Sequence, residues 1–418
     1  MVVVEPGEHV AADPRRAEGA GERRRQADRL QRGVHRERQP CRDESVGHPE
    51  LVGVRPAQHQ RDALVLDHDG ERPPGGGVPG RDRGVDELPV AGHRVEGGEH
   101  RRQVAGTGHP PSLAPGHDRG MLHTTTTPSQ RRAAFRAGLA STTLQRLPGA
   151  PNPLAARMIA EAGFEGVYLS GAVVSADLGL PDVGLTTLSE VAGRAAQVAR
   201  VTDLPLLVDA DTGFGEPLSV ARTVQVLEDA GAAGCHLEDQ ENPKRCGHLA
   251  GKRLRSPEAM ERTITAAVGA RRDPDFVLCA RTDAAAVEGL DAAIDRARRY
   301  VDAGADMIFA EALPGAAEFE RFRAAVDVPL LANMTEFGRS ELLTTARLTE
   351  IGVDAVIYPV TLFRLAMGAI ADGLATLAAD GTQAALVDRM QTRDELYRVL
   401  DYDAYAEFDS SVADFRPE

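Results

Sequence analysis

The stretch Leu204-Pro-Leu-Leu-Val-Asp-Ala-Asp-Thr-Gly-Phe-Gly-Glu-Pro217 decides how the rest of the chain is interpreted. Its apolar run predicts a buried strand, which ends in Asp209 and Asp211 before a Gly-x-Gly turn into a helix. Side chains two positions apart on a strand share a face, so both carboxylates can reach one ion. Crowded carboxylates repel one another unless a cation lies between them. Oxygen ligands favour a hard divalent cation, so we expect Mg²⁺, with Mn²⁺ as the alternative.

Two other interpretations of this stretch are weaker. Gly213 and Gly215 could belong to a dinucleotide-binding fingerprint, but Leu218 stands where the third glycine is needed. Asp211 could instead cap the helix that begins near Glu216. Glu238, at the end of the next predicted strand, favours metal binding over both.

A second loop, Lys244-Arg-Cys-Gly-His248, offers the best-placed thiol of the chain, Cys246. Its neighbours Lys244, Arg245 and His248 predict a polar, mobile loop in which nearby cations lower the pKa of the thiol. The alternative is an inert buried cysteine.

A zinc site is disfavoured for the remaining candidate ligands. It would combine Cys235, His236, Cys246 and His248, and adjacent residues of a strand point to opposite faces. Cys279 lies inside an apolar run and is assigned to the core.

Length and charge restrict the classes of protein. With 418 residues the chain can form two or three average domains or one large barrel with additions. A net charge of −15 argues against nucleic acid or an anionic membrane as the main partner. There is no unbroken run of 18 apolar residues, no signal-peptide core and no disulfide framework among four spaced cysteines. We therefore expect a soluble cytoplasmic protein.

Residues 1–120 differ in composition from the rest. They contain no Lys, Asn, Ile, Phe, Tyr or Trp, yet hold nine of the 12 histidines. Without Ile or aromatic residues no periodic apolar face forms, so no packed core is expected there. Most missing types have A/T-rich codons, so we interpret the region as translated upstream or out-of-frame GC-rich DNA, with Met121 as the natural start. A genuine disordered extension is the alternative. The expected domain is residues 121–418.

From Met121 onwards strand and helix patterns alternate. The predicted strands are 143–147, 166–170, 204–208, 233–237, 276–280, 306–310, 329–332 and 355–358. The predicted helices are 129–139, 153–162, 187–200, 217–230, 257–268, 290–303, 317–325, 340–351 and 361–378. Eight strand–helix units with short loops predict an α/β protein, a closed (β/α)₈ TIM-type barrel.

Polar residues follow these strands at their C-terminal ends, where the active sites of such barrels lie. They are Ser170, Asp209, Asp211, Glu238, Arg281, Asp283, Glu311 and Asn333. Arg281 ends an apolar strand, and an arginine beside acids and a metal suits bidentate binding of substrate carboxylates.

Several motifs carry a family resemblance that covers residues 125–410. They are Tyr168-Leu-Ser-Gly171, Leu178-Gly-Leu-Pro-Asp182, Asp209-Ala-Asp-Thr-Gly-Phe-Gly215, His236-Leu-Glu-Asp-Gln240, Lys244-Arg-Cys-Gly-His248, Ala280-Arg-Thr-Asp283, Asn333-Met-Thr-Glu-Phe337 and Gln391-Thr-Arg393. On these motifs the chain resembles the isocitrate lyase / phosphoenolpyruvate mutase superfamily. The cysteine motif is the specific part, because members that cleave a C–C bond in isocitrate-like acids carry it and phosphonomutases do not.

The resemblance is strongest to members that act on 2-methylisocitrate. It implies a Mg²⁺-dependent carbon–carbon lyase that yields pyruvate and succinate in the 2-methylcitrate cycle of propionate breakdown. By resemblance, Asp209 and Asp211 hold Mg²⁺, with Asp182 and Glu238 ordering its water shell. Cys246 is the expected acid that protonates the succinate half.

Further roles also follow from the resemblance. Arg281 is expected to act on substrate carboxylates, and Tyr168 is a candidate to help remove the hydroxyl proton. For Arg364 and Arg393 the sequence by itself is indifferent. The expected substrate-binding residues are Ser170, Gly171, Ala172, Arg245, Gly247, His248, Glu311, Asn333, Thr335, Arg364 and Arg393.

Two features bear on substrate and assembly. Ala172 stands where the 2-methylisocitrate-cleaving relatives carry Gly, and the chain lacks the Trp that true isocitrate lyases have after Ser-Gly. The missing Trp favours the methyl-bearing tricarboxylate. The helix at 361–378 resembles the swapped helix of the family and implies a homotetramer, whereas closure of its own barrel is the alternative.

Two other functions remain open. One is a related lyase or hydrolase acting on isocitrate, 2,3-dimethylmalate or oxaloacetate. The other is a catalytically silent barrel that serves as a binding protein, which the full set of polar residues at the strand ends disfavours.

Overall fold

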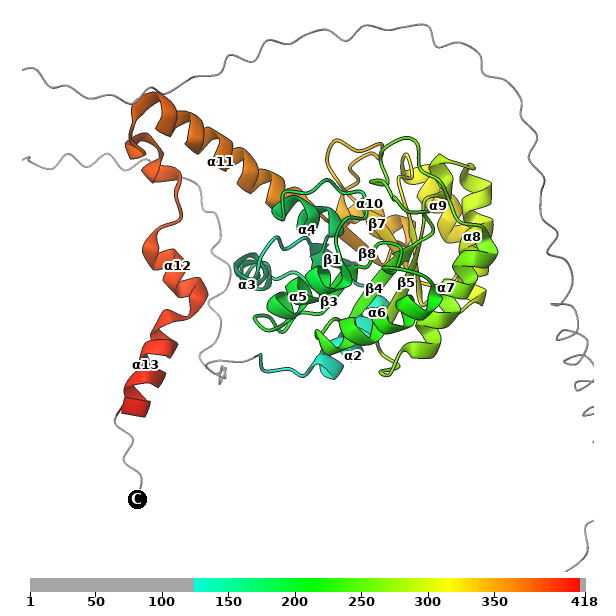
Figure 1. The fold of residues 1–418 in the computed structure, drawn as a ribbon, viewed down its shortest axis with the longest axis horizontal. Coiled ribbons are helices and arrows are strands. Elements are labelled where there is room, and N and C mark those ends of the chain that lie inside the picture. Colours follow the sequence, from blue (N-terminus) through cyan, green and yellow to red (C-terminus); the bar gives the residue numbers. More distant parts are fainter. Residues whose placement is uncertain (1–123, 414–418) are drawn as a thin grey trace, which may run out of the picture. The chain divides into compact units, whose positions relative to one another are not determined.

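Eight parallel strands form one sheet that curves into a barrel with helices around it (Figure 1). The computed structural model describes residues 124–413, so the expectations for residues 1–120 lie outside the described residues. The strands are β1 Gln145–Pro148, β2 Val167–Leu169, β3 Leu206–Asp209, β4 Gly234–Glu238, β5 Val277–Thr282, β6 Met307–Ala310, β7 Leu330–Asn333 and β8 Ala355–Tyr358.

Helices follow the strands in the order expected for a (β/α)₈ barrel, which confirms the predicted fold class. The helices are α2 Pro128–Leu139, α3 Pro153–Glu161, α4 Gly171–Asp177, α5 Leu188–Ala199, α6 Pro217–Asp229, α7 Pro257–Ala270, α8 Leu290–Asp302, α9 Ala316–Ala325, α10 Thr345–Ile351, α11 Thr361–Asp380, α12 Arg393–Leu400 and α13 Tyr402–Ala413. Short 3₁₀ turns η2 and η3 lie at Ala284–Ala286 and Ala384–Arg389.

The barrel closes between its first two strands through a narrow contact. Seven strand pairs form ladders in the order β1-β8-β7-β6-β5-β4-β3-β2, and β1 meets β2 through a single bridge between Gly149 and Tyr168. The Ala150 N–H also donates to the Tyr168 carbonyl at 3.0 Å. At Gly149 the backbone runs against Pro359, and a Cβ would overlap the Pro359 carbonyl oxygen. The close approach of the chain after β1 to Pro359 after β8 therefore requires glycine at position 149.

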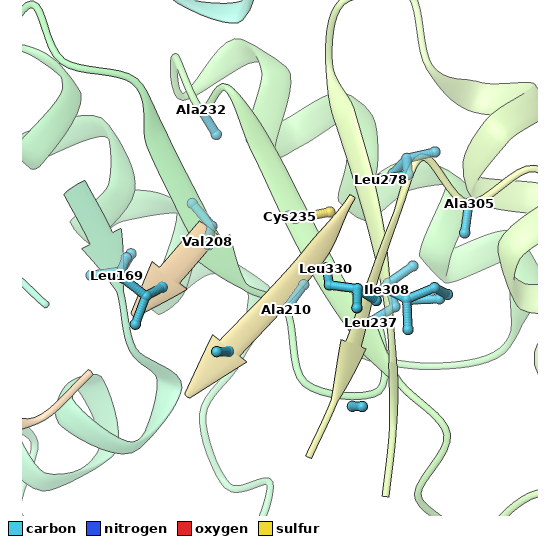
Figure 2. Close-up of a cluster of buried hydrophobic side chains, with 14 of the residues drawn as sticks. Leu169, Val208, Ala210, Ala232, Cys235, Leu237, Leu278, Ala305, Ile308 and Leu330 are labelled. Carbon is cyan, nitrogen blue, oxygen red and sulfur yellow. The ribbon is translucent and has the colours of Figure 1, made fainter. Parts of the chain in front are cut away.

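Alternation along the strands separates an inner from an outer apolar layer. Leu207 of β3 points inward and belongs to the interior cluster with Tyr168 and Phe309. Phe135 of α2 joins the same cluster. Leu206 and Val208 point outward against the helices, and Figure 2 shows part of this outer layer, with Leu169, Val208, Cys235, Leu237, Ile308 and Leu330 labelled.

One predicted helix boundary is wrong. A helix was expected over 340–351, but α10 begins at Thr345 because Thr344 caps it, its hydroxyl accepting from the Arg347 N–H. The preceding residues are irregular, and the Leu343 N–H donates to the Met334 sulfur at 3.2 Å. This cap satisfies an N–H group that otherwise has no partner at a helix start.

Helix α11 is apolar but has no buried residue. By length and composition it could cross a membrane, with a mean hydropathy of 1.4, and it is the one such helix among residues 124–413. A single helix of this kind is weak evidence for a membrane span. In this chain it does not close its own barrel, which was the alternative to a swapped helix.

The close backbone contact at Gly149 gives a stability prediction. Gly149→Ala is expected to lower the free energy of unfolding by about 1–3 kcal/mol, because the added methyl group overpacks a backbone contact. The matched control is Gly193→Ala inside α5, where nothing lies within 4 Å of an added Cβ. It is expected to raise that free energy by up to about 1 kcal/mol, since alanine is the better helix former. Urea unfolding followed by circular dichroism measures both, and effects of equal sign would contradict the closure argument.

Candidate active site

Acidic and basic side chains converge at the C-terminal mouth of the barrel. The inward alternation that places Leu207 in the core continues to Asp209, and likewise from Cys279 to Arg281 on β5. Residues on five neighbouring strands or their ends reach the mouth, and all are buried except the half-buried Asn333; they are Asp209, His236, Glu238, Arg281, Asp283, Glu311 and Asn333.

Asp209 and Asp211 face the same small space above Gly171. The Gly171 N–H donates to Asp209 Oδ2 at 3.0 Å, and the Asp211 N–H donates to Asp209 Oδ1 at 3.1 Å. A Cβ on Gly171 would lie 2.9 Å from Asp209 Oδ2 and 3.2 Å from Asp211 Oδ1. Asp211 has a φ of 46°, a left-handed conformation that a non-glycine residue rarely adopts. The backbone is thus bent to bring the second carboxylate beside the first.

The ammonium of Lys244 lies against these acids, a contact that sequence reasoning missed. Lys244 is buried, with its Nζ 2.7 Å from Asp211 Oδ1 and paired also with Asp182. Burial by itself would lower the pKa of Lys244, but the carboxylates of Glu238, Asp211 and Asp209 outweigh it and raise that pKa above its usual range. The cysteine motif therefore contributes a permanent positive charge to the acidic cluster.

The neighbouring carboxyl groups titrate differently. Burial would raise the pKa of Asp209, but His236, Lys244 and Arg281 outweigh it and lower that pKa to about 2. Burial and the charge of Asp209 raise the pKa of Asp211 to about 6. The cluster therefore holds more negative charge than its cations neutralise.

Glu238 is a buried acid of the mouth, and Arg281 Nε lies 3.4 Å from its Oε2. Burial raises its pKa well above the usual range. Neither carboxylate oxygen of Glu238 has a hydrogen-bond partner among residues 124–413. A raised pKa favours the protonated, uncharged form of Glu238, and the carboxylate oxygens of Asp209 and Asp211 are the ligand type that a hard divalent cation prefers. The donor chemistry of Asp209 and Asp211 therefore suits Mg²⁺, but among the described residues no group of three or more His, Cys, Asp or Glu side chains is arranged to hold a metal ion.

His236 is a mouth residue that sequence reasoning did not select. Its Nε2 lies 2.8 Å from the Tyr168 hydroxyl, and the two rings stack with their centroids 5.9 Å apart. Burial lowers the pKa of His236 to about 4, and burial together with Asp209 raises the pKa of Tyr168 well above its usual value. At pH 7 the ring is neutral and the phenol keeps its proton. The sequence contained an indication of this position, because His236 lies two positions before Glu238 on one strand and residues at that spacing share a face.

Arg281 is the central cation of the other side of the mouth. Its Nε lies 3.0 Å from Asp283 Oδ2 and 3.4 Å from Glu238 Oε2, and its Nη2 lies 3.8 Å from Glu311 Oε1. The guanidinium also stacks over the Phe309 ring at 5.1 Å. Three carboxylates share the Arg281 guanidinium, so their negative charges set the orientation of the Arg281 side chain.

The loop between β4 and α7, residues 239–256, closes over these side chains, and we call it the cysteine loop. The backbone of Gly247 rests directly on Glu311 and Arg281, and a Cβ there would overlap both. His248 Nε2 lies 3.2 Å from Glu311 Oε1, while its Nδ1 accepts from the Arg339 N–H at 2.9 Å. The loop therefore covers the mouth and joins the loop after β7.

The side chain of Gln240 fixes the middle of the cysteine loop. Its Nε2 donates to the Arg245 carbonyl and its Oε1 accepts from the Arg245 N–H, both at 2.9 Å. Cys246 follows directly and is half-buried. The expected mobile loop is, in this structure, held by paired hydrogen bonds.

The expectation for the Cys246 thiol has the wrong sign. Nearby cations were expected to lower its pKa. Burial instead raises the pKa of Cys246, and the negative charges of Glu311 and Asp182 add to the effect. A thiol that keeps its proton is suited to donate it, so the shift favours an acid over a nucleophile.

The remaining predicted binding residues fall into two groups. Ser170 and Thr335 are buried at the mouth, beside Gly171 and Asn333 respectively. The Asn333 Nδ2 donates to Glu311 at 3.3 Å, and its Oδ1 has no hydrogen-bond partner among the described residues. Ala172 is half-buried in the first turn of α4.

Arg364 and Arg393 are not brought into the mouth by their own chain. Arg364 donates to the Glu336 carbonyl at 2.6 Å and stacks over Phe337. Arg393 is exposed at the start of α12, and α12 packs against α3. The difference arises because these residues follow β8, where the chain leaves the barrel.

Comparisons with known proteins agree with this site. The family model for phosphoenolpyruvate phosphomutase matches residues 135–378. Probable 2-methylisocitrate lyase 2 of Corynebacterium glutamicum is 64% identical over 293 residues, which cover 70% of this chain and 95% of that protein. The 2-methylisocitrate lyase of Escherichia coli is 48% identical over 276 residues, covering 66% and 93%.

Solved structures show the same likeness. An oxaloacetate acetylhydrolase in complex with 3,3-difluorooxalacetate matches with a TM-score of 0.65 and 34% identity, covering 69% of this chain and 99% of that one. A phosphonopyruvate hydrolase in complex with oxalate and Mg²⁺ matches with a TM-score of 0.62 and 30% identity, covering 68% and 99%.

The raised pKa of Cys246 gives a pH prediction. Iodoacetamide reacts with the thiolate, so its rate at Cys246 is expected to be slow at pH 7 and still rising above pH of about 9, beyond the ordinary cysteine pKa of about 8.5. Mass spectrometry of the Cys246 peptide at a series of pH values measures this rate. Glutathione in the same tubes is the control for an exposed thiol. A Cys246 rate that levels off at a lower pH than the glutathione rate would show a lowered pKa and would contradict this prediction.

Proposed function

This chain belongs to the phosphoenolpyruvate phosphomutase family, and we propose that it is the member that cleaves 2-methylisocitrate into pyruvate and succinate with Mg²⁺. One observation carries the proposal beyond the family. A proton-bearing thiol, Cys246, lies on a loop that rests on Arg281 and Glu311, next to the Asp209 and Asp211 pair. Of the two relatives reported above, one is named a 2-methylisocitrate lyase and the other a probable 2-methylisocitrate lyase.

The residues present account for the steps of a carbon–carbon cleavage. As the bond breaks, the hydroxyl-bearing carbon becomes the carbonyl of pyruvate and the hydroxyl proton leaves. The electron pair stays on the carbon that becomes succinate, and Cys246 is the donor that protonates it. Bound Mg²⁺ supplies positive charge that stabilises negative charge developing on carboxylate and hydroxyl oxygens. Asp209 and Asp211 would hold the ion.

Arg281 and its neighbours provide the substrate carboxylates with partners. Burial would raise the pKa of Glu311, but Arg281 and His248 outweigh it and keep that pKa low. The ionised Glu311 in turn orients Asn333 and His248. Fixed donors of this kind lose little energy to reorganisation when charge develops. Tyr168, which keeps its proton, serves here as a hydrogen-bond donor, and the base that accepts the hydroxyl proton is not assigned.

A product assay tests the proposal. The full chain with Mg²⁺ is expected to release pyruvate from 2-methylisocitrate with a higher kcat/KM than it shows for isocitrate, 2,3-dimethylmalate or oxaloacetate, and EDTA is expected to abolish turnover. Cys246→Ser is expected to lower kcat by about 10²–10⁴-fold, the usual contribution of a general acid. Cys235→Ala, in the outer core layer, is the matched control and stays within about two-fold.

The assays with the other acids also test the alternative substrates. A higher kcat/KM for oxaloacetate or 2,3-dimethylmalate would replace the proposed substrate, with Ala172 as the residue to exchange for glycine. A Cys246→Ser variant as active as the unaltered chain would remove the acid from the proposed mechanism. We place the enzyme in the cytoplasm, in the 2-methylcitrate cycle of propionate breakdown.

We further propose that the chain assembles as a homotetramer through α11. Met367, Ile370, Leu374 and Leu377 are exposed at helical spacing and form one apolar stripe. A second copy of the barrel is the occupant that this stripe fits, because such exposed patches mark interfaces.

Sedimentation tests the assembly. The full chain without detergent is expected to sediment as a tetramer, and a variant with Ile370→Asp and Leu374→Asp is expected to sediment as smaller species, because charges in an apolar interface are costly. Ala379→Asp, half a turn away on the opposite side of α11, is the control and keeps the tetramer. A monomeric unaltered chain, or one that needs detergent to stay in solution, would contradict the proposed role of α11.

A further inference from the structure

The cysteine loop contains both lysines of the chain. Among the 48 lysine and arginine residues, Lys244 and Lys252 are the two lysines and all others are arginine. Both lysines are buried. In a chain that otherwise uses arginine for positive charge, these positions select the compact ammonium over the planar guanidinium. Lys244 already has a role beside Asp211, whereas Lys252 has none in the mechanism above.

Lys252 connects the cysteine loop to the barrel. Its side chain is 1% exposed, and its Nζ donates to the Gly247 carbonyl and lies 2.9 Å from Asp283 Oδ1. An ammonium this deeply buried needs a counter-charge and hydrogen-bond acceptors. The loop can therefore take its closed position only with Lys252 placed between Gly247 and Asp283.

Asp283 cannot follow the loop if the loop moves. Its N–H donates to Asp239 Oδ1 at 2.9 Å, and Asp239 Oδ2 accepts from the hydroxyls of Thr282 and Tyr300 at 2.8 Å each. Thr282 belongs to β5 and Tyr300 to α8, and Asp239, the first residue of the cysteine loop, is tied to β5 because its N–H donates to the Arg281 carbonyl at 3.2 Å. Asp283 is thus a fixed point on the barrel.

The same carboxylate holds Arg281. Its Oδ2 lies 3.0 Å from Arg281 Nε and its Oδ1 lies 3.3 Å from Arg281 Nη2, so Oδ1 is shared between Arg281 and Lys252. Gly247, which Lys252 holds by its carbonyl, rests on the Arg281 guanidinium. A shift of Lys252 therefore moves both Gly247 and the charge that orients Arg281.

We propose that Lys252 is a positioning residue, which fixes the closed cysteine loop and the Arg281 guanidinium in one arrangement through Gly247 and Asp283. It does not touch the substrate. It places Cys246, the residue next to Gly247, above the site that Arg281 defines. The inference rests on the proposed lyase function for its kinetic readout, while the movement of the loop is measured without turnover.

Two kinds of measurement on the full chain test this proposal. Lys252→Met removes the charge at similar length, and it is expected to lower kcat about 10²-fold, the loss that a misplacement of about 1 Å produces. KM for 2-methylisocitrate is expected to change by less than about three-fold. Acetylation of Lys244 by an N-succinimidyl acetate reagent, followed by mass spectrometry, is expected to become at least about ten-fold faster, because the loop opens.

Arg253→Met is the matched control. Arg253 is the next residue, is exposed, and pairs with Glu241 at 3.3 Å on the surface, so kcat and Lys244 acetylation are expected to stay within about two-fold. Lys252→Arg keeps the charge beside Asp283 and so preserves the fold even where the Met variant fails to fold. Its larger head displaces Gly247, so kcat is expected to remain at least about ten-fold low.

Two results would overturn the proposal. One is a Lys252→Met variant that loses kcat while Lys244 stays as protected as in the unaltered chain. The other is a Lys252→Arg variant with unaltered kcat, which would make Lys252 an ordinary ion-pair partner. If the unaltered chain cleaves none of the tested acids, the lyase function fails, while the acetylation rates still decide whether Lys252 holds the loop.

Discussion

An excess of buried carboxylates at the barrel mouth is the constraint on which the rest of this structure depends. Asp209, Asp211, Glu238, Asp283 and Glu311 share the buried cations Lys244, Lys252 and Arg281. Each buried acid needs positive charge or hydrogen-bond donors, and Glu238 lacks hydrogen-bond donors among the described residues. A divalent cation held by Asp209 and Asp211, as proposed above, would add positive charge beside these acids. The same electrostatic demand therefore favours a cation at the mouth and the observed position of the cysteine loop, which brings Lys244 and Lys252 to the acids.

The cysteine loop follows from this demand. Two of the three cations lie on the loop, so the loop brings its charges to the acids only when it closes. In this position of the loop Cys246 is half-buried, and burial raises the pKa of its thiol, which favours the protonated form that the proposed acid role needs. The loop that brings two cations to the acids thus also carries the thiol that the proposed mechanism uses. Asp283 is held at the end of β5 through Asp239, Thr282 and Tyr300, whereas Lys244, Cys246 and Lys252 lie on the cysteine loop.

Parts of the chain away from the mouth bear on the stability of the barrel and on its proposed assembly. Phe135 and Leu139 of α2 extend the interior cluster at the N-terminal end, away from the polar mouth. Gly149 completes the barrel with one bridge to β2, and its lack of a side chain allows the close approach to Pro359 after β8. Helix α11 leaves an apolar stripe without partners within residues 124–413. Burial of that stripe by another copy would complete each barrel and add apolar burial that one chain does not provide.

The sequence by itself determined the eight strand–helix units and the side chains at their ends, because alternation and strand length are local properties of the chain. It located Asp209, Asp211, Glu238, Arg281, Asp283 and Glu311 at the mouth, and its motifs identified the family. Only the tertiary structure decided the charge balance. It placed Lys244 against Asp211, joined His236 to Tyr168, reversed the expected shift of Cys246, and left Arg393 outside the mouth. Burial and the distance between residues remote in sequence set these interactions, and neither is encoded in a local pattern.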